Sequence, residues 1–367
     1  MNNMNEIETG KEQHMKQPVM KTFSIVLVLL VLVTGNAVAG GENRVGTSAA
    51  SELLIPVGAR DIAMGGSSIA TSTGLEAIFW NPAGLARSTH AANAMFSHMQ
   101  YIADIGVDYV GVSGTFEGFG TLGLTVKSLS IGNIGVTTED QPDGTGQLLS
   151  PTVAVVGMTY SRLLTDRISI GTTINIISER FDRVSATGFA VNAGVQYSGL
   201  GGVRGLSLGV AVKNIGPQLT FDGDGLLRQG NVNDVLRPGS FYKVQAASHE
   251  LPSTIEIGLA YSTTLAEQSS LELSSVFQNN NFATDEYKVG LEYGFNNLFF
   301  LRGGYGFAES SESASSPLPD KKTHIFGLTA GAGIHHDLGG LDLTFDYAFR
   351  DVEFLDSNHI FSLKVGF

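Results

Sequence analysis

The chain has 367 residues, of which 22 are basic and 35 acidic, so its formal net charge is −13 at pH 7. This acidity argues against nucleic acid as a partner, and the absence of cysteine excludes disulfides and thiolate metal sites. Only 16% of the residues are charged, below the roughly 25% that is usual in soluble globular proteins.

Residues 20–40 have the pattern of a cleavable secretory signal. A positively charged start precedes an apolar run from Ile25 to Val33, and small residues follow as far as Ala39. The run is about 9 residues long, whereas a helix that crosses a bilayer takes about 20. We expect residues 1–39 to be removed by cleavage after Ala39, with Met20 as an alternative start; an uncleaved anchor is the competing interpretation.

Residues 40–93 are predicted to form a separate amino-terminal segment of short helices. Thr73 and Glu76 have the spacing of a capping box ahead of a short apolar stretch. Asn81 and Pro82 then have the residue types of an N-cap and a first helical position. Helices of one or two turns are unstable alone, so this segment is expected to pack against a larger structure.

Residues 94–367 are dominated by period-two alternation, which predicts about fourteen strands with two unlike faces. Ile255 and Ile257, for example, flank Glu256. In a soluble sandwich the large residues would face a shared core. In a membrane barrel they face lipid, and the charged positions face a wet or plugged lumen. Charges at so many alternate positions would each cost several kcal/mol in a dry core, so we predict an all-β fold, a transmembrane antiparallel barrel in the bacterial outer membrane.

The lengths of the connections support the barrel. The long ones are predicted at residues 133–150, 214–251 and 309–322, as connections three, seven and eleven. Short turns fall on even connections, so the long loops share one side, as in outer-membrane barrels. A further strand within residues 236–248 would alter the strand count.

Three motifs are interpreted as turns. Gly118–Gly123 matches a dinucleotide fingerprint by letter, but a strand rather than a helix follows it. Residues 222–225 lack the later glutamate of a calcium loop, and His335 and His336 are adjacent, so they point to opposite strand faces. No nucleophile elbow or zinc-protease motif occurs. We therefore expect no enzyme, cofactor or metal site, although a serine and a histidine that meet across strands would escape this search.

The amino-terminal segment contains three motifs: Leu54-Ile-Pro-x-Gly-Ala-Arg60, Met64-Gly-Gly66 and Phe79-Trp-Asn-Pro-Ala-Gly-Leu85. Together they resemble the signature of the PorV/PorQ family, part of the superfamily of FadL-type outer-membrane barrels. This resemblance implies a barrel of fourteen strands whose amino-terminal segment folds into the lumen as a plug. The plug motif then consists of Pro56, Gly58, Arg60, Met64, Gly65, Gly66, Trp80, Asn81, Pro82, Ala83, Gly84 and Leu85.

The resemblance implies two alternative functions. PorV-like members are non-enzymatic parts of type IX secretion that receive exported cargo proteins and pass them to a surface attachment complex. FadL-type relatives take up hydrophobic small molecules, such as long-chain fatty acids, through a plugged lumen with an opening in the wall. The second function needs an apolar lumenal pocket, for which the candidates are Ile62, Met64, Ile78, Phe79 and Leu85.

The last strand carries large residues at steps of two: Phe361, Leu363, Val365 and Phe367. This looks like the carboxyl-terminal signal read by the outer-membrane assembly machinery. Its simpler interpretation, a last strand that faces lipid, is compatible with that role.

Overall fold

The computed structural model describes residue 44 and residues 46–230, 240–308 and 325–367. The chain forms two units, residues 1–38 and 39–367, and every described residue belongs to the second. The signal sequence, the cleavage after Ala39 and the alternative start at Met20 lie outside the described residues and stay predictions.

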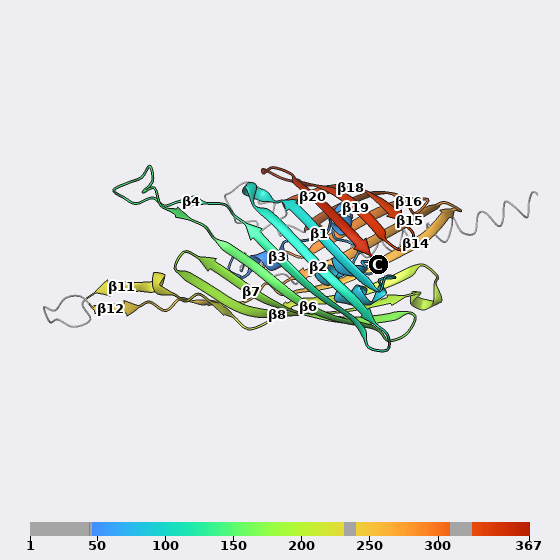
Figure 1. The fold of residues 1–367 in the computed structure, drawn as a ribbon, viewed down its shortest axis with the longest axis horizontal. Helices are drawn as coiled ribbons and strands as arrows, with labels where there is room; N and C mark the ends of the chain where they lie inside the picture. Colours follow the sequence, from blue (N-terminus) through green and yellow to red (C-terminus); the bar gives the residue numbers. More distant parts are fainter. Residues whose placement is uncertain (1–43, 45, 231–239, 309–324) are drawn as a thin grey trace, which may run out of the picture. The chain divides into compact units, whose positions relative to one another are not determined.

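Within the described residues, fourteen strands form one closed antiparallel barrel, as predicted (Figure 1). Each strand pairs with its neighbours in the order of the sequence, and the last pairs with the first, with Ala94 opposite Val365. The strands are β1 (Ala92–Gln100), β2 (Gly106–Phe116), β3 (Gly120–Ser130), β6 (Thr152–Leu163), β7 (Ile168–Phe181), β8 (Val184–Ser198), β9 (Leu206–Ile215), β14 (Thr254–Ala266), β15 (Ser269–Asn280), β16 (Glu286–Phe295), β17 (Phe299–Ala308), β18 (Phe326–Asp337), β19 (Asp342–Val352) and β20 (Asn358–Gly366).

The two faces of the strands are arranged as the alternation predicted. In β14, Ile255 and Ile257 are each 48% exposed on the outside, whereas Glu256 between them is 1% exposed inside. The same contrast separates Phe345 from Asp346 in β19. A soluble sandwich would bury the aliphatic side chains, so the exposure confirms a wall that faces lipid.

The connections also fall as predicted. Even connections are short, whereas β3–β6 and β9–β14 are joined by residues 131–151 and 216–253. The first carries the hairpin β4–β5 (Ile134–Gly135, Leu148–Leu149), and the second carries β10–β13 (Leu219–Thr220, Ser248–His249) and β11–β12 (Leu227–Gly230, Ser240–Lys243). The extra strand considered within residues 236–248 is β12, which pairs with β11 and leaves the barrel count unchanged. The barrel end with the long connections, called the outer face below, carries the β4–β5 and β11–β12 hairpins, which are called the outer hairpins (Figure 1). The third predicted loop, 309–322, lies outside the described residues.

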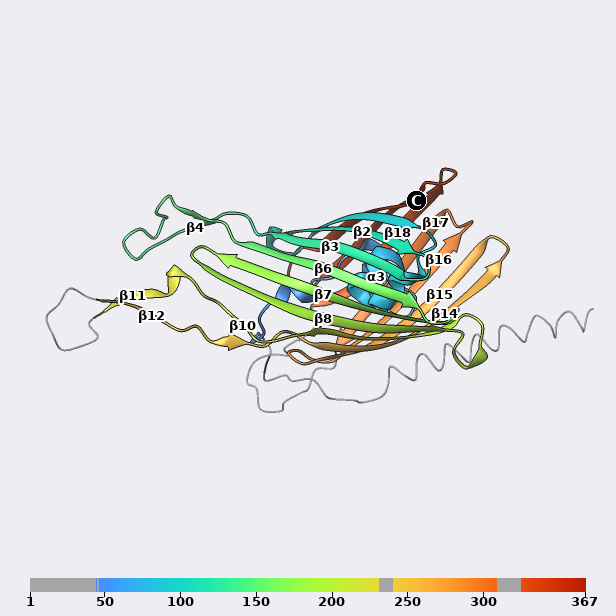
Figure 2. The same cartoon turned by 60° about the horizontal axis from the view of Figure 1, so that its bottom comes forward.

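The segment before β1 forms the plug, which lies in the lumen (Figure 2). Its elements are η2 (Ser51–Leu54), α2 (Ala59–Ala63), α3 (Gly74–Trp80) and η3 (Pro82–Arg87). Further single turns are η4 (Ile102–Asp104), η5 (Leu200–Gly202) and η6 (Asp224–Leu226). Among the described residues, none of the helices is long and apolar enough to cross a membrane.

One local prediction was wrong. Thr73 does occupy the N-cap position of α3, but its side chain makes no capping hydrogen bond. Glu76 does not reach back to it, because its carboxylate pairs with Lys364 of β20. An ion pair with the barrel wall thus replaces the local capping box.

Candidate functional site: the plug and its cavities

Asn81 links two parts of the plug to each other and to the barrel wall. It is fully buried, and its Oδ1 accepts a hydrogen bond from the Ala83 amide at 3.2 Å, which confirms the predicted N-cap ahead of Pro82. Its Nδ2 donates to the carbonyls of Ile69 at 2.9 Å and Val195 at 3.1 Å. One side chain therefore caps η3, ties it to an earlier turn of the plug and attaches both to β8.

The rest of the plug motif packs around Trp80. The indole Nε1 donates to the Val57 carbonyl at 3.0 Å, and the Phe79 ring lies edge-on to the indole at 5.0 Å. A side chain at Gly66, whose φ is +74°, would collide with the Trp80 ring. The structure thus buries most of the motif residues, among them Pro56, Met64, Ala83, Gly84 and Leu85, whereas Arg60 and Gly65 are half-buried.

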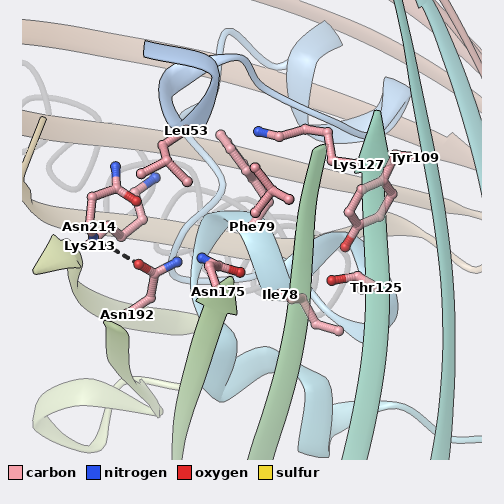
Figure 3. A pocket seen from close by; sticks show the side chains of 11 residues that line it. Leu53, Ile78, Phe79, Tyr109, Thr125, Lys127, Asn175, Asn192, Lys213 and Asn214 are labelled. Atoms are coloured by element: carbon pink, nitrogen blue, oxygen red, sulfur yellow. Dashed lines mark hydrogen bonds between the residues drawn. The ribbon is translucent and has the colours of Figure 1, made fainter. Parts of the chain in front are cut away.

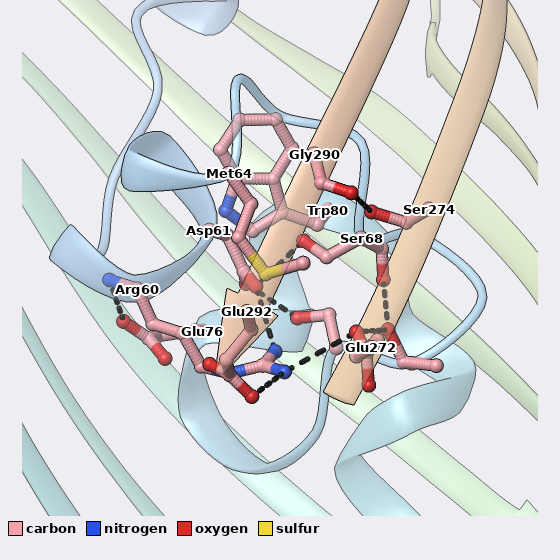
Figure 4. A network of polar contacts seen from close by, with 12 residues as sticks. Arg60, Asp61, Met64, Ser68, Glu76, Trp80, Glu272, Ser274, Gly290 and Glu292 are labelled. Atoms are coloured by element: carbon pink, nitrogen blue, oxygen red, sulfur yellow. Dashed lines mark hydrogen bonds and ion pairs between the residues drawn. The ribbon is translucent and has the colours of Figure 1, made fainter. Parts of the chain in front are cut away.

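Arg60 of α2 is the centre of a polar network between plug and wall (Figure 4). Its guanidinium meets Glu292 of β16 at 3.0 and 3.1 Å, and Glu272 of β15 at 3.4 Å. Asp61 lies 3.1 Å away and accepts hydrogen bonds from Ser68 and Ser72, both at 2.6 Å. The plug is therefore held by charge-assisted hydrogen bonds in a water-poor lumen.

The network continues around the wall. Glu292 pairs with Arg302 of β17, whose Nη1 lies 2.6 Å from Asp346 of β19. Lys364 of β20 bonds Asp346 and Glu76 of the plug, each at 2.9 Å. Acidic and basic side chains therefore alternate along a series of ion pairs that starts at Glu272 of β15 and ends at Glu76 of the plug. The order is Glu272, Arg60, Glu292, Arg302, Asp346, Lys364 and Glu76.

Two plug groups have strongly shifted pKa values. Burial would lower the pKa of Arg60, but the carboxylates of Glu292, Glu272 and Asp61 outweigh it and hold that pKa well above its usual value. Burial, together with the nearby carboxylate of Glu179, raises the pKa of Glu52 to about 8. Glu52 is thus a neutral acid in the folded plug at neutral pH.

The plug separates two larger cavities. The outer cavity, about 330 Å³, lies among Leu54, Trp80, Lys213 and Arg350. The inner cavity, about 300 Å³, lies on the side of the short turns among Arg87, His90 and Lys364. Arg60, Glu292 and Arg302 line the inner cavity, and Ile62, Gly65 and Gly66 of the plug line the outer one.

A third space, about 30 Å³, surrounds the Phe79 ring (Figure 3). The ammonium groups of Lys127 and Lys213 lie 5.0 and 4.8 Å from the ring centroid, on two sides of it. Lys127 also donates to the carbonyls of Glu52 at 2.7 Å and Ile55 at 3.0 Å. This volume suits about one water molecule.

The apolar pocket proposed from sequence is mostly filled. Ile62, Met64, Ile78 and Leu85 are at most 3% exposed and pack within the plug and against the wall. Ile62 and Phe79 border the outer cavity, and Ile78 and Phe79 border the small space around the Phe79 ring. The wall itself is hydrogen-bonded between all neighbouring strands, with register shifts at residues 191–193, 264–266 and 326–329.

The structure also shows where the carboxyl-terminal residues and the motifs interpreted as turns lie. Phe361 and Leu363 face outward on β20, and Phe367 closes the seam, since its amide donates to the Ala92 carbonyl at 2.9 Å. Gly118 lies in the β2–β3 turn, and Asp222 pairs with Lys243 in the outer loop. His335 was interpreted as part of a solvated turn, but it borders the inner cavity and bonds Asp342 at 2.8 Å.

This fold, with its filled lumen and apolar outer wall, defines an outer-membrane β-barrel with an internal plug. Within that class, the chain belongs to the family of the type IX secretion system protein PorV, whose family model matches residues 38–265. No curated protein matches the sequence.

Solved structures of the same fold include two toluene transporters. TbuX of Ralstonia pickettii has a TM-score of 0.54 and 13% identity, over 85% of this chain and 98% of that chain. TodX of Pseudomonas putida has a TM-score of 0.53 and 13% identity, over 84% and 97% of the two chains. At such identities the likeness shows the fold alone, which is the FadL-like barrel that the amino-terminal signature indicated.

Proposed function

We propose that this barrel is a non-enzymatic component of type IX secretion that binds exported proteins at its outer face and passes them to a surface attachment complex. Membership of the PorV family supports the pathway. The observation that carries the binding role is the exposure of large apolar side chains outside the lipid-facing wall.

These side chains lie on the outer hairpins. Leu148 of β5 is 66% exposed and Phe241 of β12 is 72% exposed, with Tyr242 beside it. Both hairpins belong to long connections, beyond the strands that lipid covers. Exposed aromatic and aliphatic groups in water are typical of protein-binding surfaces.

The fixed plug also favours binding over conduction. Ion pairs from Arg60 and Glu76 and hydrogen bonds from Asn81 hold it to the wall on several sides. Displacing it would leave several buried charges without partners, which costs several kcal/mol for each. The outer face is therefore where this barrel acts on proteins.

The test replaces Phe241 and Tyr242 by serine in a strain that depends on this protein. We expect normal amounts of folded barrel but a several-fold loss of cargo attached to the cell surface. The matched control is Phe119→Ser, because Phe119 is 52% exposed on a turn at the opposite end of the barrel. Normal attachment by the hairpin variant, or equal loss with the control, would refute the proposal.

Uptake of hydrophobic compounds is a second candidate, favoured by the apolar side of the outer cavity, where Leu54, Ile55 and Trp80 meet. It predicts that purified barrel carries a lipid-like molecule and that a deletion strain accumulates less of it. Unchanged uptake together with lost cargo attachment would leave secretion as the function.

A further inference from the structure

The β11–β12 hairpin rises from a short base next to the barrel (Figure 2). The base consists of the strand pair β10–β13 and of Glu250 and Leu251, which follow β13. The hairpin and its base have two arms. The first arm leaves the wall after β9 and contains β10 and β11, whereas the second contains β12 and β13 and returns to β14. Each arm is held by a different part of the molecule.

The first arm is held by the barrel wall. The amide of Asp222 donates to the carbonyl of Ser185 in β8 at 2.9 Å, and the carbonyl of Asp222 accepts from the amide of Ser185 at 2.8 Å. The amide of Gly225 donates to the carbonyl of Arg183 at 3.2 Å. These backbone hydrogen bonds fix the first arm to the turn between β7 and β8.

The second arm is held by the plug. The amide of Ala49 donates to the carbonyl of Glu250 at 2.9 Å, and the Glu250 carboxylate lies 2.7 Å from Nη2 of Arg44. The Arg44 guanidinium also lies 4.1 Å from the centroid of the Phe282 ring and donates to Oδ1 of Asn281 at 3.2 Å. The first residues of the plug therefore join the second arm to the turn between β15 and β16.

Apolar packing joins the plug to both arms. Leu53 of η2, Leu219 of β10 and Leu251 belong to one cluster and are each at most 5% exposed. The pair of Arg44 and Glu250 is exposed to water and contributes little by itself. The buried leucines contribute more, because each removes a large apolar surface from water. Leu53 is therefore the plug residue on which the base of the hairpin depends most.

We propose that the start of the plug, Arg44 and Ala49–Leu53, positions the β11–β12 hairpin for the exported protein, which rests on the binding role proposed above for that hairpin. A two-stranded hairpin is marginally stable alone in water, so it needs a support that holds Phe241 and Tyr242 in one orientation. A fixed orientation lowers the entropy that is lost when a partner binds. The plug thus supports the outer face in addition to filling the lumen, and Leu53 is a positioning residue that acts through the hairpin.

Two spin labels measure the position of the hairpin without any partner. They are attached to cysteines introduced by Arg228→Cys on β11 and Ser178→Cys on the exposed face of β7, in a chain that has no other cysteine. Leu53→Ala should roughly double the width of the distance distribution between the labels in purified barrel, because the second arm loses its packing on the plug. Leu75→Ala is the matched control, since it removes the same side chain from a different buried cluster of the plug and should leave the width unchanged.

An unchanged width in a folded Leu53→Ala barrel, or equal broadening by the control, would overturn the proposal. Heat-modifiable mobility shows whether each variant is folded. If Leu53→Ala does not fold, Leu251→Ala removes packing from the hairpin side of the same cluster and decides in its place.

Cargo attachment separates a failure of this inference from a failure of the secretion role. At normal amounts of folded barrel, Leu53→Ala should lower the cargo on the cell surface several-fold, and Leu75→Ala should not. If replacing Phe241 and Tyr242 abolishes attachment but Leu53→Ala does not, the hairpin binds without support from the plug and only this inference fails. If neither change affects attachment, the secretion role fails, whereas the label distances still decide whether the plug positions the hairpin.

Discussion

Arg60 of the plug and Glu292 of β16 form a two-point ion pair across the lumen. Nε lies 3.0 Å from Oε2 and Nη2 lies 3.1 Å from Oε1, so both ends of the guanidinium fork face the carboxylate. This geometry fixes the orientation of the side chain as well as its distance from the wall. The position of α2 in the lumen is therefore defined by charge, in addition to packing.

Replacing Arg60 by glutamine should loosen the plug. The change leaves Glu272 and Asp61 in the lumen without their cation, and breaking a buried ion pair typically costs about 3 to 5 kcal/mol. Hydrogen exchange over residues 58–80 should then speed up while the strands stay protected. The exposed Arg180→Gln is the control, and unchanged exchange in Arg60→Gln would show that the network does not hold the plug.

The outer end of the plug should loosen as pH rises. Because the pKa of Glu52 is raised from 4.5 to about 8 by burial and by Glu179, the folded state favours the protonated acid. The stabilisation is fully present below pH 4.5, declines between pH 4.5 and 8, and is lost above that. Exchange of the amides in η2, corrected for the intrinsic effect of pH, should rise by about an order of magnitude or more across this range.

Glu52→Gln tests the assignment, since glutamine cannot titrate. The variant should show the same exchange in η2 at pH 5 and pH 8 after correction. If its pH dependence equals that of the unaltered protein, another group is responsible.

The barrel could be predicted because its signal repeats along the chain. Exposed residues such as Ile170, Ile174 and Ile176 all lie at even positions of one strand, and lipid requires such an apolar face on every strand. The N-cap at Asn81 was predictable as well, because capping depends on residues adjacent in sequence.

The network around Arg60 could not be predicted in the same way. Its partners Glu272 and Glu292 are more than 200 residues away, and pairing them requires the closed barrel and the position of the plug. Glu76 shows the limit most clearly, since a local rule suggested a capping box and a distant lysine took the carboxylate. The sequence contained one usable signal for this network, since Glu292 and Arg302 occupy opposite positions in the neighbouring strands β16 and β17.

A charge on the outer wall should hinder insertion. Met158 is 57% exposed in the middle of β6, where arginine costs about 2 to 4 kcal/mol near the bilayer midplane. Met158→Arg should therefore lower the amount of heat-modifiable barrel in the membrane. Leu148→Arg, on a hairpin outside the wall, should leave the amount of barrel in the membrane unchanged. Equal amounts of the two variants would contradict the assignment of the outward-facing side chains of β6 to lipid.

Removal of Phe367 should reduce the yield of folded barrel. Its amide donates to the Ala92 carbonyl at 2.9 Å, and its carbonyl accepts from the Ala91 and Ala92 amides at 2.9 and 3.3 Å. The deletion weakens the β20–β1 seam and removes the last residue of the predicted assembly signal. Phe367→Tyr keeps both features and serves as the control. Membrane levels equal to those of the unaltered protein would argue against either role.

The most direct test of a fixed plug and an active outer face is to lock the plug in place. The hydroxyl oxygens of Ser67 and Ser274 lie 2.6 Å apart, so cysteines at both positions are well placed for a disulfide in a chain that otherwise has none. The amount of cargo attached to the cell surface is then measured with the disulfide oxidised and reduced. We predict equal attachment in both states. Attachment that is lost on oxidation and restored on reduction would contradict it, because the plug would then have to move.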